Sequence, residues 1–444
     1  MTTIDTATEP SADRVARWGL FFALAYAVQG YAQTTGVLMQ PINYFYKVEH
    51  GYTASQLAGV SFWMTFPWYI KPVYGLLADF IPLFGYRRRS YLIVSCVVAA
   101  AAFLLLLKIT DPVVLVYALT LTALCTAIGD VMVDALMVEH GQRLNKIKRF
   151  QGIQWSVLSV LGVFAALAGG WFAEYAKEIG EPHRAIEFGA LVAMTGPIVL
   201  LISTLWIVRE PRSRLDAEGV AATAKGFRAA LTSKPLLGVL VFICMFWFQP
   251  GLAATMYLHA TETLEISEAF YGTADAWAKA GYVLGALAFM LVLGPRLSTR
   301  QLAILSILVY AAVTFGYLGL VGKKTLVVLS FAYGVCYMVS VLTLMSLAAE
   351  VCPRRVEGFV FAFLMGVMNF VRMGSDWIGG RIYDELVPVY NGTATEGLWT
   401  VLSGMKHPVD PLIVISGVIT LLAFVFVPLL PKRDKQETAP AEPV

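Results

Sequence analysis

The sequence predicts an all-α membrane protein in which twelve transmembrane helices form two six-helix bundles, with both termini in the cytoplasm. Of its 444 residues, 58% are hydrophobic and 14% are charged, and the mean hydropathy is +0.68. Such a chain is too apolar for a soluble protein of this length. Apolar runs of about 20 residues, enough to cross ~30 Å of hydrocarbon, recur along it. Helices are expected because lipid offers no partners to unpaired backbone groups, and the alternating pattern of a barrel is absent.

The positions of the basic residues predict the orientation. Of the 33 Lys and Arg residues, 22 fall in tails and loops on one side of the expected membrane, seven on the other, and four within spans or at their ends. Positive residues are retained in the cytoplasm, so the richer side, which includes both tails, is predicted to be cytoplasmic. The polar N-terminus is unlike a signal peptide, and a bacterial inner membrane is the simplest location. The expected spans are 17–40, 56–80, 90–108, 112–139, 150–176, 188–208, 235–259, 268–294, 297–320, 325–350, 356–382 and 409–430.

A charged segment, residues 209–234, divides the chain near its middle. Six helices, a basic cytoplasmic linker and six more helices are typical of the two parallel repeats of the major facilitator fold. The expected organisation is a cytoplasmic tail (1–16), an N-terminal bundle (17–208), the linker (209–234), a C-terminal bundle (235–430) and a disordered tail (431–444).

Polar residues inside the first two spans indicate a polar path through the bilayer. Lys71 lies deep in the second span, where a charge costs roughly 2.5–3.5 kcal/mol on insertion scales, so it is expected to face a partner or a wet cavity. Gln29 and Gln33 are one turn apart and add hydrogen-bonding capacity to a central cavity. Pro67 and Pro72 are expected to kink the second span.

The loop after the second span resembles the helix 2–3 signature of major facilitators, stretched by a few residues. Its parts are Gly75–Asp79 and Gly85–Arg89. In that signature an acid at a helix end and basic loop residues hold one conformation and release in the other. Asp79 is therefore a candidate gating residue. The arginines either join this gate or only set the topology; they are Arg87, Arg88 and Arg89.

Two carboxylates share one face of the fourth span. Asp130 and Asp134 are four residues apart, so their side chains lie one above the other. Two like charges in a poorly solvated place perturb each other's protonation, and proton coupling requires a carboxylate that binds and releases a proton near neutral pH. The alternative is a structural ion-pair network with Lys71 or the basic loop. Glu139, at the cytoplasmic end, is expected to anchor the gating loop.

Positive charges in the later spans are candidates for binding an anion. Arg372 lies about 16 residues, or about 24 Å, into the eleventh span, too deep for an end charge. Lys279 occupies the eighth span, and both cations could attract an anionic substrate. The alternative is that Arg372 pairs with Asp376 and Lys279 with Asp275, neutralising each other for insertion. Asn369 precedes Arg372 by one turn and is a further candidate for binding the substrate.

Amide and aromatic side chains complete the candidate cavity. Gln154 and Trp155 lie in the fifth span, and Trp247 and Tyr257 lie in the seventh, which Pro250 is expected to kink. The three aromatic residues either stack on a planar ring or serve packing and the membrane interface.

No pattern in the chain predicts a metal, a cofactor or a catalytic set. The five cysteines show no CxxC or Cys/His spacing, the histidines are dispersed, and there is no Walker loop, Ser/His/Asp set or HExxH motif. A membrane enzyme is therefore the least favoured class. The net charge of +3 gives no reason to expect a nucleic-acid partner.

Three motifs together resemble the signature of the folate–biopterin transporter family within the major facilitator superfamily. They are KPVYGLLADFIPLFGYRRRSY (71–91), DVMVDALMVE (130–139), and LAAEVCP (347–353) with EGFVFAFLMGVMN (357–369). The resemblance spans roughly residues 20–385. It implies transport of folates or pterins with protons, and a transport-critical set that comprises Lys71, Asp79, Asp130, Asp134 and Asn369.

The sequence thus predicts a monomeric secondary transporter that moves an anionic folate or pterin, with protons, across the lipid bilayer by alternating access. One alternative is a muropeptide or other organic-solute permease of the same superfamily, since muropeptide permeases have a related lysine, arginine triplet and acidic motif. The other is a membrane receptor with the same fold that transports nothing, because paired intramembrane charges are all that such a receptor requires.

Overall fold

The computed structural model describes residues 12–144, 146–213, 225–228, 231–352, 357–393 and 404–431. Within these ranges the secondary structure is helical, apart from an isolated bridge between Leu83 and Tyr86. Nine of the described helices are long and apolar enough to cross a membrane. The all-helical fold class is confirmed, and twelve spans with cytoplasmic termini stay predictions.

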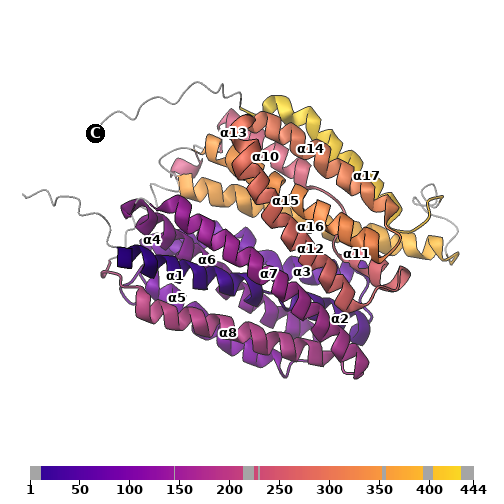
Figure 1. Cartoon of the computed structure of the whole chain (residues 1–444), viewed down its shortest axis with the longest axis horizontal. Helices are drawn as coiled ribbons and strands as arrows, with labels where there is room; N and C mark the ends of the chain where they lie inside the picture. Colours follow the sequence, from indigo (N-terminus) through magenta and orange to yellow (C-terminus); the bar gives the residue numbers. More distant parts are fainter. Residues whose placement is uncertain are drawn as a thin grey trace, which may run out of the picture.

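Two groups of helices lie one above the other (Figure 1). The N-terminal group packs mainly through α1 on α7 and α8, and α5 on α6 and α8; the C-terminal group packs mainly through α15 on α12 and α14. The first group is α1 (Ala12–Ala32), α2 (Met39–His50), α3 (Ala54–Tyr69), α4 (Lys71–Phe80), α5 (Arg89–Leu106), α6 (Pro112–Arg143), α7 (Ile147–Glu178) and α8 (His183–Ile207).

The second group contains several short helices that continue or interrupt the longer ones. We call the end of the molecule where α1 begins the terminal end and the opposite end, near α2 and α11, the far end (Figure 1). The elements are α10 (Lys234–Trp247), α11 (Ala254–Leu258), η1 (His259–Thr263), α12 (Glu268–Ala288), η2 (Phe289–Leu293), α13 (Gly294–Arg296), α14 (Thr299–Gly316), η3 (Tyr317–Gly319), α15 (Lys323–Val351), α16 (Glu357–Tyr390), α17 (Asp410–Leu422) and η5 (Ala423–Leu429).

The expectation of one uninterrupted first helix over 17–40 is wrong. The helix α1 ends at Ala32, and a tight turn precedes α2. The turn is closed by a 2.9 Å hydrogen bond from Val37 N to Tyr31 O. Gly36 permits it, because a Cβ atom there would lie 2.4 Å from the Tyr31 carbonyl oxygen. Gly36 follows three polar residues, Gln33, Thr34 and Thr35, which mark the place where the apolar run is interrupted.

The expected interruptions of the second and seventh spans are confirmed. The second span breaks at Ile70, between α3 and α4, with Pro72 in the first turn of α4, where a missing N–H costs no helical hydrogen bond. The seventh breaks between Trp247 and Ala254, around Pro250 and a glycine at φ +79°, Gly251.

Side chains of α16 satisfy the backbone that the seventh-span break exposes. Gln249 N donates to Ser375 Oγ at 3.2 Å, and Ala253 N donates to an Asp376 carboxylate oxygen at 2.9 Å. Irregular backbone at membrane depth requires such partners, since lipid supplies none. The break is therefore a built feature of the fold.

The two groups meet along a seam formed by α7 with α12 and by α3 with α16. Glycines allow close approach there. A Cβ atom on Gly272 of α12 would lie 2.7 Å from Ala166 O and 2.8 Å from Gly170 Cα of α7. Small residues at helix contacts are typical of membrane proteins, where packing replaces the hydrophobic driving force.

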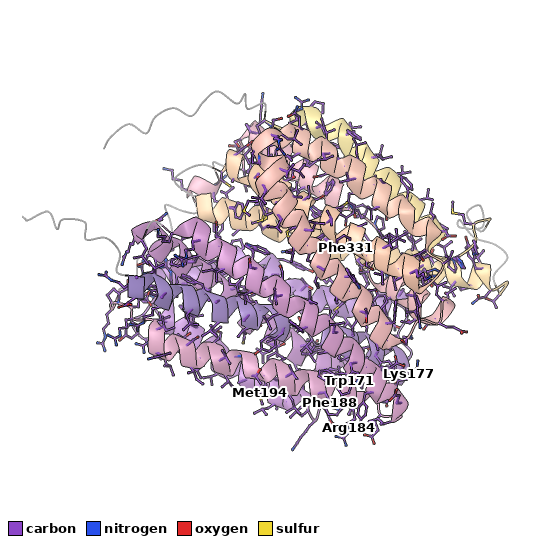
Figure 2. All side chains as sticks on the ribbon, in the orientation of Figure 1. Trp171, Lys177, Arg184, Phe188, Met194 and Phe331 are labelled. Atoms are coloured by element: carbon purple, nitrogen blue, oxygen red, sulfur yellow. The ribbon has the colours of Figure 1, made fainter. Side chains whose placement is uncertain are left out.

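An aromatic band covers the lower surface of α7 and α8 toward the far end. Trp171 is 57% exposed and stacks on Tyr175, which contacts Phe188. Figure 2 shows Trp171 of α7 near Phe188 and Met194 of α8, with the charged Lys177 of α7 farther toward the far end. Aromatic rings followed by charges are typical of the membrane–water interface.

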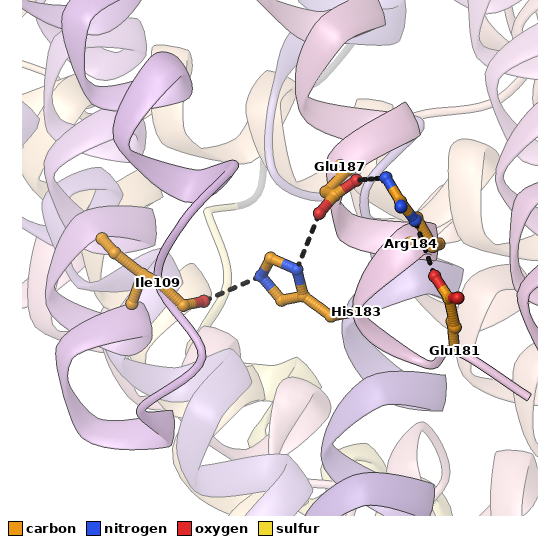
Figure 3. Close-up of polar contacts among 5 residues, drawn as sticks. All are labelled: Ile109, Glu181, His183, Arg184 and Glu187. Carbon is orange, nitrogen blue, oxygen red and sulfur yellow. Dashed lines mark hydrogen bonds and ion pairs between the residues drawn. The ribbon is translucent and has the colours of Figure 1, made fainter.

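Polar contacts at the far end tie the α5–α6 loop to the start of α8 (Figure 3). His183 bonds Ile109 O at 2.9 Å through Nε2 and Glu187 at 3.2 Å through Nδ1. Arg184 bridges Glu187 and Glu181 at 2.6 and 2.7 Å. Exposed pairs of this kind are weak because water screens them, so they position the loop more than they stabilise the fold.

Substituting Gly272→Ala should lower the melting temperature of the purified protein, because the new methyl group meets α7 backbone atoms and overpacking costs roughly 1–3 kcal/mol. The control is Gly152→Ala on α7, where a Cβ atom meets nothing within 4 Å. That change should leave stability unchanged or raise it, since alanine favours a helix over glycine by about 1 kcal/mol. Equal melting shifts for both variants would contradict the close seam.

Candidate functional site

A buried ion pair occupies the N-terminal half. Lys71, the first residue of α4, pairs with Asp130 of α6. The Lys71 ammonium also lies 4.1 Å from the centroid of the Trp68 ring, an attraction that strengthens in a desolvated place. The break at Ile70 starts a new helix at Lys71 and directs this charge toward α6. The ion-pair alternative that the sequence left open is therefore present for Asp130.

Asp134 has a different partner. Its carboxylate accepts a 2.5 Å hydrogen bond from the Tyr26 hydroxyl of α1. In the part of the chain that the structure describes, no Lys or Arg forms an ion pair with Asp134. The two carboxylates on one face of α6 thus differ: one is paired with a cation and the other with a neutral hydroxyl. The sequence missed Tyr26, although it lies three residues before Gln29 on the same helix face.

A small cavity adjoins this pair. It has a volume of about 30 Å³ and is lined by Asp130, Gln29, Gln33 and Thr126, together with apolar side chains. A volume of this size holds about one or two water molecules. The two glutamines expected to hydrogen-bond in a central cavity therefore line a pocket inside the N-terminal half that reaches Asp130.

The candidates on α7 differ in exposure. Gln154 is buried, and its side-chain nitrogen has no hydrogen-bond partner in the structure. Trp155 is 39% exposed, with its ring centroid 6.5 Å from that of Tyr26. An unpaired buried amide costs roughly 1–3 kcal/mol, so Gln154 is a group that a bound ligand or water would stabilise.

In the C-terminal half, the expected pairing of Arg372 with Asp376 is not formed. Asp376 instead accepts the backbone N–H of Ala253 at the seventh-span break. Backbone donors exposed by that break are nearer, and they must be satisfied at this depth. The Arg372 guanidinium lies 5.7 Å from the Tyr337 ring centroid, and among the described residues its Nε has no hydrogen-bond partner.

The expected intrahelical pair in α12 is confirmed. Lys279 Nζ lies 3.9 Å from Asp275 Oδ1 and 5.1 Å from the Tyr282 ring centroid. Its stem reaches the seam, because a Cβ atom on Gly162 of α7 would lie 3.9 Å from Lys279 Cδ. Lys279 is therefore a cation at the boundary between the two halves.

Asn369 lies half-buried on α16, beside Phe370. The Phe370 ring contacts Phe62 and Tyr69 of α3, with centroids 5.9 and 5.7 Å apart. This part of α16 therefore belongs to the seam. Asn369 and Arg372 are one turn apart on it.

The gating candidates form contacts within the N-terminal half. Arg88 pairs with Glu139, which also pairs with Arg143 at 2.9 Å. The Glu210 carboxylate accepts the backbone N–H groups of Arg88 and Arg89, both at 3.0 Å, and so caps the start of α5. These contacts do not cross the seam. The other two gating candidates contribute no contact to this description. Arg87 is half-buried, and the Asp79 side chain lies outside the described residues.

A charged contact that the sequence did not reveal does cross the seam at the far end. Lys47 of α2 lies 3.6 Å from Glu268 at the start of α12 and donates to Thr261 at 2.8 Å. Tyr257 donates to the same carboxylate at 3.1 Å. Glu268 is 3% exposed. No local pattern links residues more than 200 positions apart, so no signal could have found this contact.

A second far-end contact joins α3 to α16. The Asp384 carboxylate accepts from the Thr53 hydroxyl at 2.6 Å and from the backbone N–H groups of Ala54 and Ser55 at 3.0 and 3.1 Å. An acid from one half thus caps a helix of the other. Together, the Lys47 and Asp384 contacts hold the two halves together at the far end.

Comparison with solved structures places this fold among membrane transporters. An auto-inhibited POT family peptide transporter superposes with a TM-score of 0.69 at 12% identity, covering 95% of this chain and 99% of that one. The nucleoside transporter NupG gives a TM-score of 0.64 at 13% identity, covering 95% and 100%. At these identities the likeness shows the fold alone, a major facilitator fold.

Sequence relatives narrow the class. The folate-biopterin transporter of Synechocystis sp. is 27% identical over 94% of this chain and 83% of its own length. Probable folate-biopterin transporter 4 of Arabidopsis thaliana is 23% identical over 71% and 79%, and folate transporter 2 of Plasmodium falciparum is 21% identical over 74% and 72%.

The apolar helices and the relatives named as transporters indicate a multi-pass integral membrane transporter, not an enzyme. The sequence model of the BT1 family matches residues 29–443, nearly the whole chain. The chain therefore belongs to the BT1 family, and the resemblance to folate–biopterin transporters is confirmed.

Substituting Lys71→Met should destabilise the protein by roughly 3–5 kcal/mol, because it leaves the Asp130 carboxylate buried without a cation. Thermal unfolding in detergent measures the effect. The double variant Lys71→Met with Asp130→Asn should recover most of the loss, since neither charge then remains. Additive losses in the double variant would show that the two side chains do not interact.

Proposed function

We propose that this protein is a secondary transporter that moves folate or pterin anions across the membrane by alternating access, coupled to protons. The observation that carries the proposal is the placement of charge. Lys279 and Arg372 lie on seam helices of one half, and the Lys71–Asp130 pair beside Asp134 lies in the other. Relatives named for folate and biopterin transport support the substrate class.

The N-terminal half handles the proton in this proposal. Asp130 is the partner of Lys71, and Asp134, bonded to the neutral Tyr26 hydroxyl, binds and releases the proton. A charge change at Asp134 alters the field at the neighbouring pair, because electrostatic interactions are strong where water is scarce. Lys71 thereby links protonation to the arrangement of α4 and α6.

The far end serves as one gate. The Lys47–Glu268 and Asp384 contacts close it in this structure, so transport requires them to separate while the terminal end closes. With both termini cytoplasmic, as the basic residues predict, the far end faces outward from the cell. A monomer in a bacterial inner membrane agrees with this arrangement. The arginine triplet, with Asp79 and Glu139, holds the loop at the cytoplasmic end.

Uptake assays in proteoliposomes separate substrate transport from its coupling to protons. Wild-type protein should accumulate labelled folate in response to an imposed proton gradient and exchange it in counterflow. Asp134→Asn should abolish gradient-driven accumulation and keep counterflow, because exchange of substrate needs no net proton movement. Tyr26→Phe is the matched change at the partner residue and should shift the pH dependence of accumulation without abolishing it.

Binding without counterflow in the wild-type protein would favour the receptor alternative. If the protein exchanged a muropeptide in counterflow but no folate or pterin, the proposed substrate class would be wrong. The proposed alternating-access mechanism would still hold. Unchanged gradient-driven accumulation in Asp134→Asn would remove that residue from proton coupling.

A further inference from the structure

Aromatic side chains from two helices surround the Arg372 guanidinium of a third. Tyr282 comes from α12 and Tyr333 and Tyr337 from α15, and all three interact electrostatically with Arg372. The Tyr337 ring centroid lies 5.7 Å from the guanidinium. The Tyr282 and Tyr337 rings stack at 5.1 Å with 28° between their planes, and the Tyr333 and Tyr337 rings at 5.8 Å with 29°. We call these three residues the tyrosine box.

The tyrosine box has a buried wall behind it. Trp247 and Tyr310 are 1% and 3% exposed, and their rings contact Tyr337 and Tyr333 respectively. The three tyrosines in front are only partly buried, as is Arg372. A layered arrangement of this kind fixes the front rings in position while leaving part of their surface accessible.

The tyrosine box faces the seam. Lys279, one turn before Tyr282, reaches Gly162 of α7 with its stem. Arg372 lies close enough to Tyr69 of α3 for the two side chains to interact electrostatically. Lys279 and Arg372 therefore both lie near helices of the N-terminal half, at the seam. A transported molecule must bind at this boundary between the two halves.

The chemistry of the tyrosine box suits a flat, electron-poor ring with an acceptor edge. Partly exposed, nearly parallel tyrosines offer stacking surface. The Arg372 Nε–H has no acceptor in the structure, and a guanidinium is a planar donor fork that fits such an edge. The Nε atom itself is buried although the residue is only partly so, and leaving a charged donor unpaired there is costly. A simple packing role would not require a cation among the rings.

We propose that the tyrosine box, with Arg372, is the subsite that binds the pteridine ring, and that Lys279 attracts the carboxylate of the bound anion. The inference rests on the proposed transport of folates and pterins. It goes beyond that proposal by assigning ring recognition and proton coupling to different halves of the molecule. The C-terminal half recognises the ring, and the Lys71–Asp130–Asp134 cluster of the N-terminal half carries the coupling. Selectivity for planar rings is then a property of Tyr282 and Tyr337.

Binding of three probes to the purified full-length protein tests the division. Pterin carries the ring alone, p-aminobenzoylglutamate the tail alone, and folate carries both. Tyr282→Leu and Tyr337→Leu should each weaken pterin and folate binding about tenfold, since aromatic stacking on a base contributes about 1–3 kcal/mol. The affinity for p-aminobenzoylglutamate should change less than about twofold, because in the proposed division its aminobenzoyl ring and carboxylates bind outside the tyrosine box. Tyr282→Phe and Tyr337→Phe keep the rings and should bind all three probes as the wild type does.

Tyr383→Leu is the matched control, a buried tyrosine of α16 in the same half but outside the tyrosine box. It should leave the affinities for all three probes unchanged. Arg372→Lys should also weaken the binding of pterin, because a point charge replaces the planar guanidinium donor. If a leucine variant fails to fold, Arg372→Lys decides the test, because unchanged pterin affinity in that variant would overturn the proposal.

The possible failures are distinguishable. If the wild-type protein binds neither pterin nor folate, the proposed function itself fails. If it binds them and both leucine variants bind them equally well, the ring is held elsewhere and the tyrosine box is packing. Equal weakening of p-aminobenzoylglutamate and pterin would also overturn the division, because it would show a general loss of the site.

Discussion

The neutralisation of charge inside apolar helices is the constraint on which the rest of this structure depends. A lone charge at this depth costs several kcal/mol, so each one is placed against a partner. Lys71 meets Asp130 and a tryptophan face, Lys279 meets Asp275, and Arg372 lies against a tyrosine ring. Three different solutions serve three cations, and of these only the first is an ion pair between two helices. The cations with weaker partners are those on the seam.

The helix breaks follow from the same constraint. The interruption at Ile70 starts α4 at Lys71 and sets that charge toward α6. The interruption before Ala254 leaves backbone donors that Asp376 and Ser375 satisfy. That use of Asp376 removes the partner that the sequence suggested for Arg372. A backbone requirement in one helix thus leaves a guanidinium available in the next.

The sequence predicted what depends on local pattern. Apolar runs indicated most of the helices, prolines indicated two of the breaks, and the four-residue spacing placed Asp130 and Asp134 on one face. The spacing of Lys279 and Asp275 likewise predicted their contact. The turn after Ala32 was not predicted, although Gln33, Thr34 and Thr35 interrupt the apolar run just before Gly36, where the backbone approaches too closely for a side chain.

The sequence could not predict contacts that depend on how the two halves meet. Lys47 and Glu268 are far apart in the chain, and each alone is an ordinary residue near a helix end. The tyrosine box draws on α12 and α15, and tyrosine is common in membrane proteins, so its members carry no signal individually. The predicted partner of Asp376 was wrong for the same reason, because the competing donor at Ala253 lies on another segment of the chain.

The charged contacts at the two ends of the molecule differ in whether they cross the seam. At the far end, Lys47 and Asp384 join the halves across the seam. At the terminal end, the Arg88 and Glu139 contacts stay within one half. The two halves are thus joined by charged contacts at the far end, whereas the charged contacts at the terminal end do not join them. An alternating-access transporter requires such an asymmetry in each of its two states. The central claim is therefore that the two ends exchange these roles.

Distances between spin labels at both ends test that claim most directly. One pair of labels, at Glu178 and Glu262, spans the far end, and another, at Gln142 and Arg296, spans the terminal end; all four positions are exposed. With folate and a lowered pH, the account predicts a population in which the far-end distance lengthens and the terminal-end distance shortens. Two distances that stay fixed, or that change in the same direction, would contradict it.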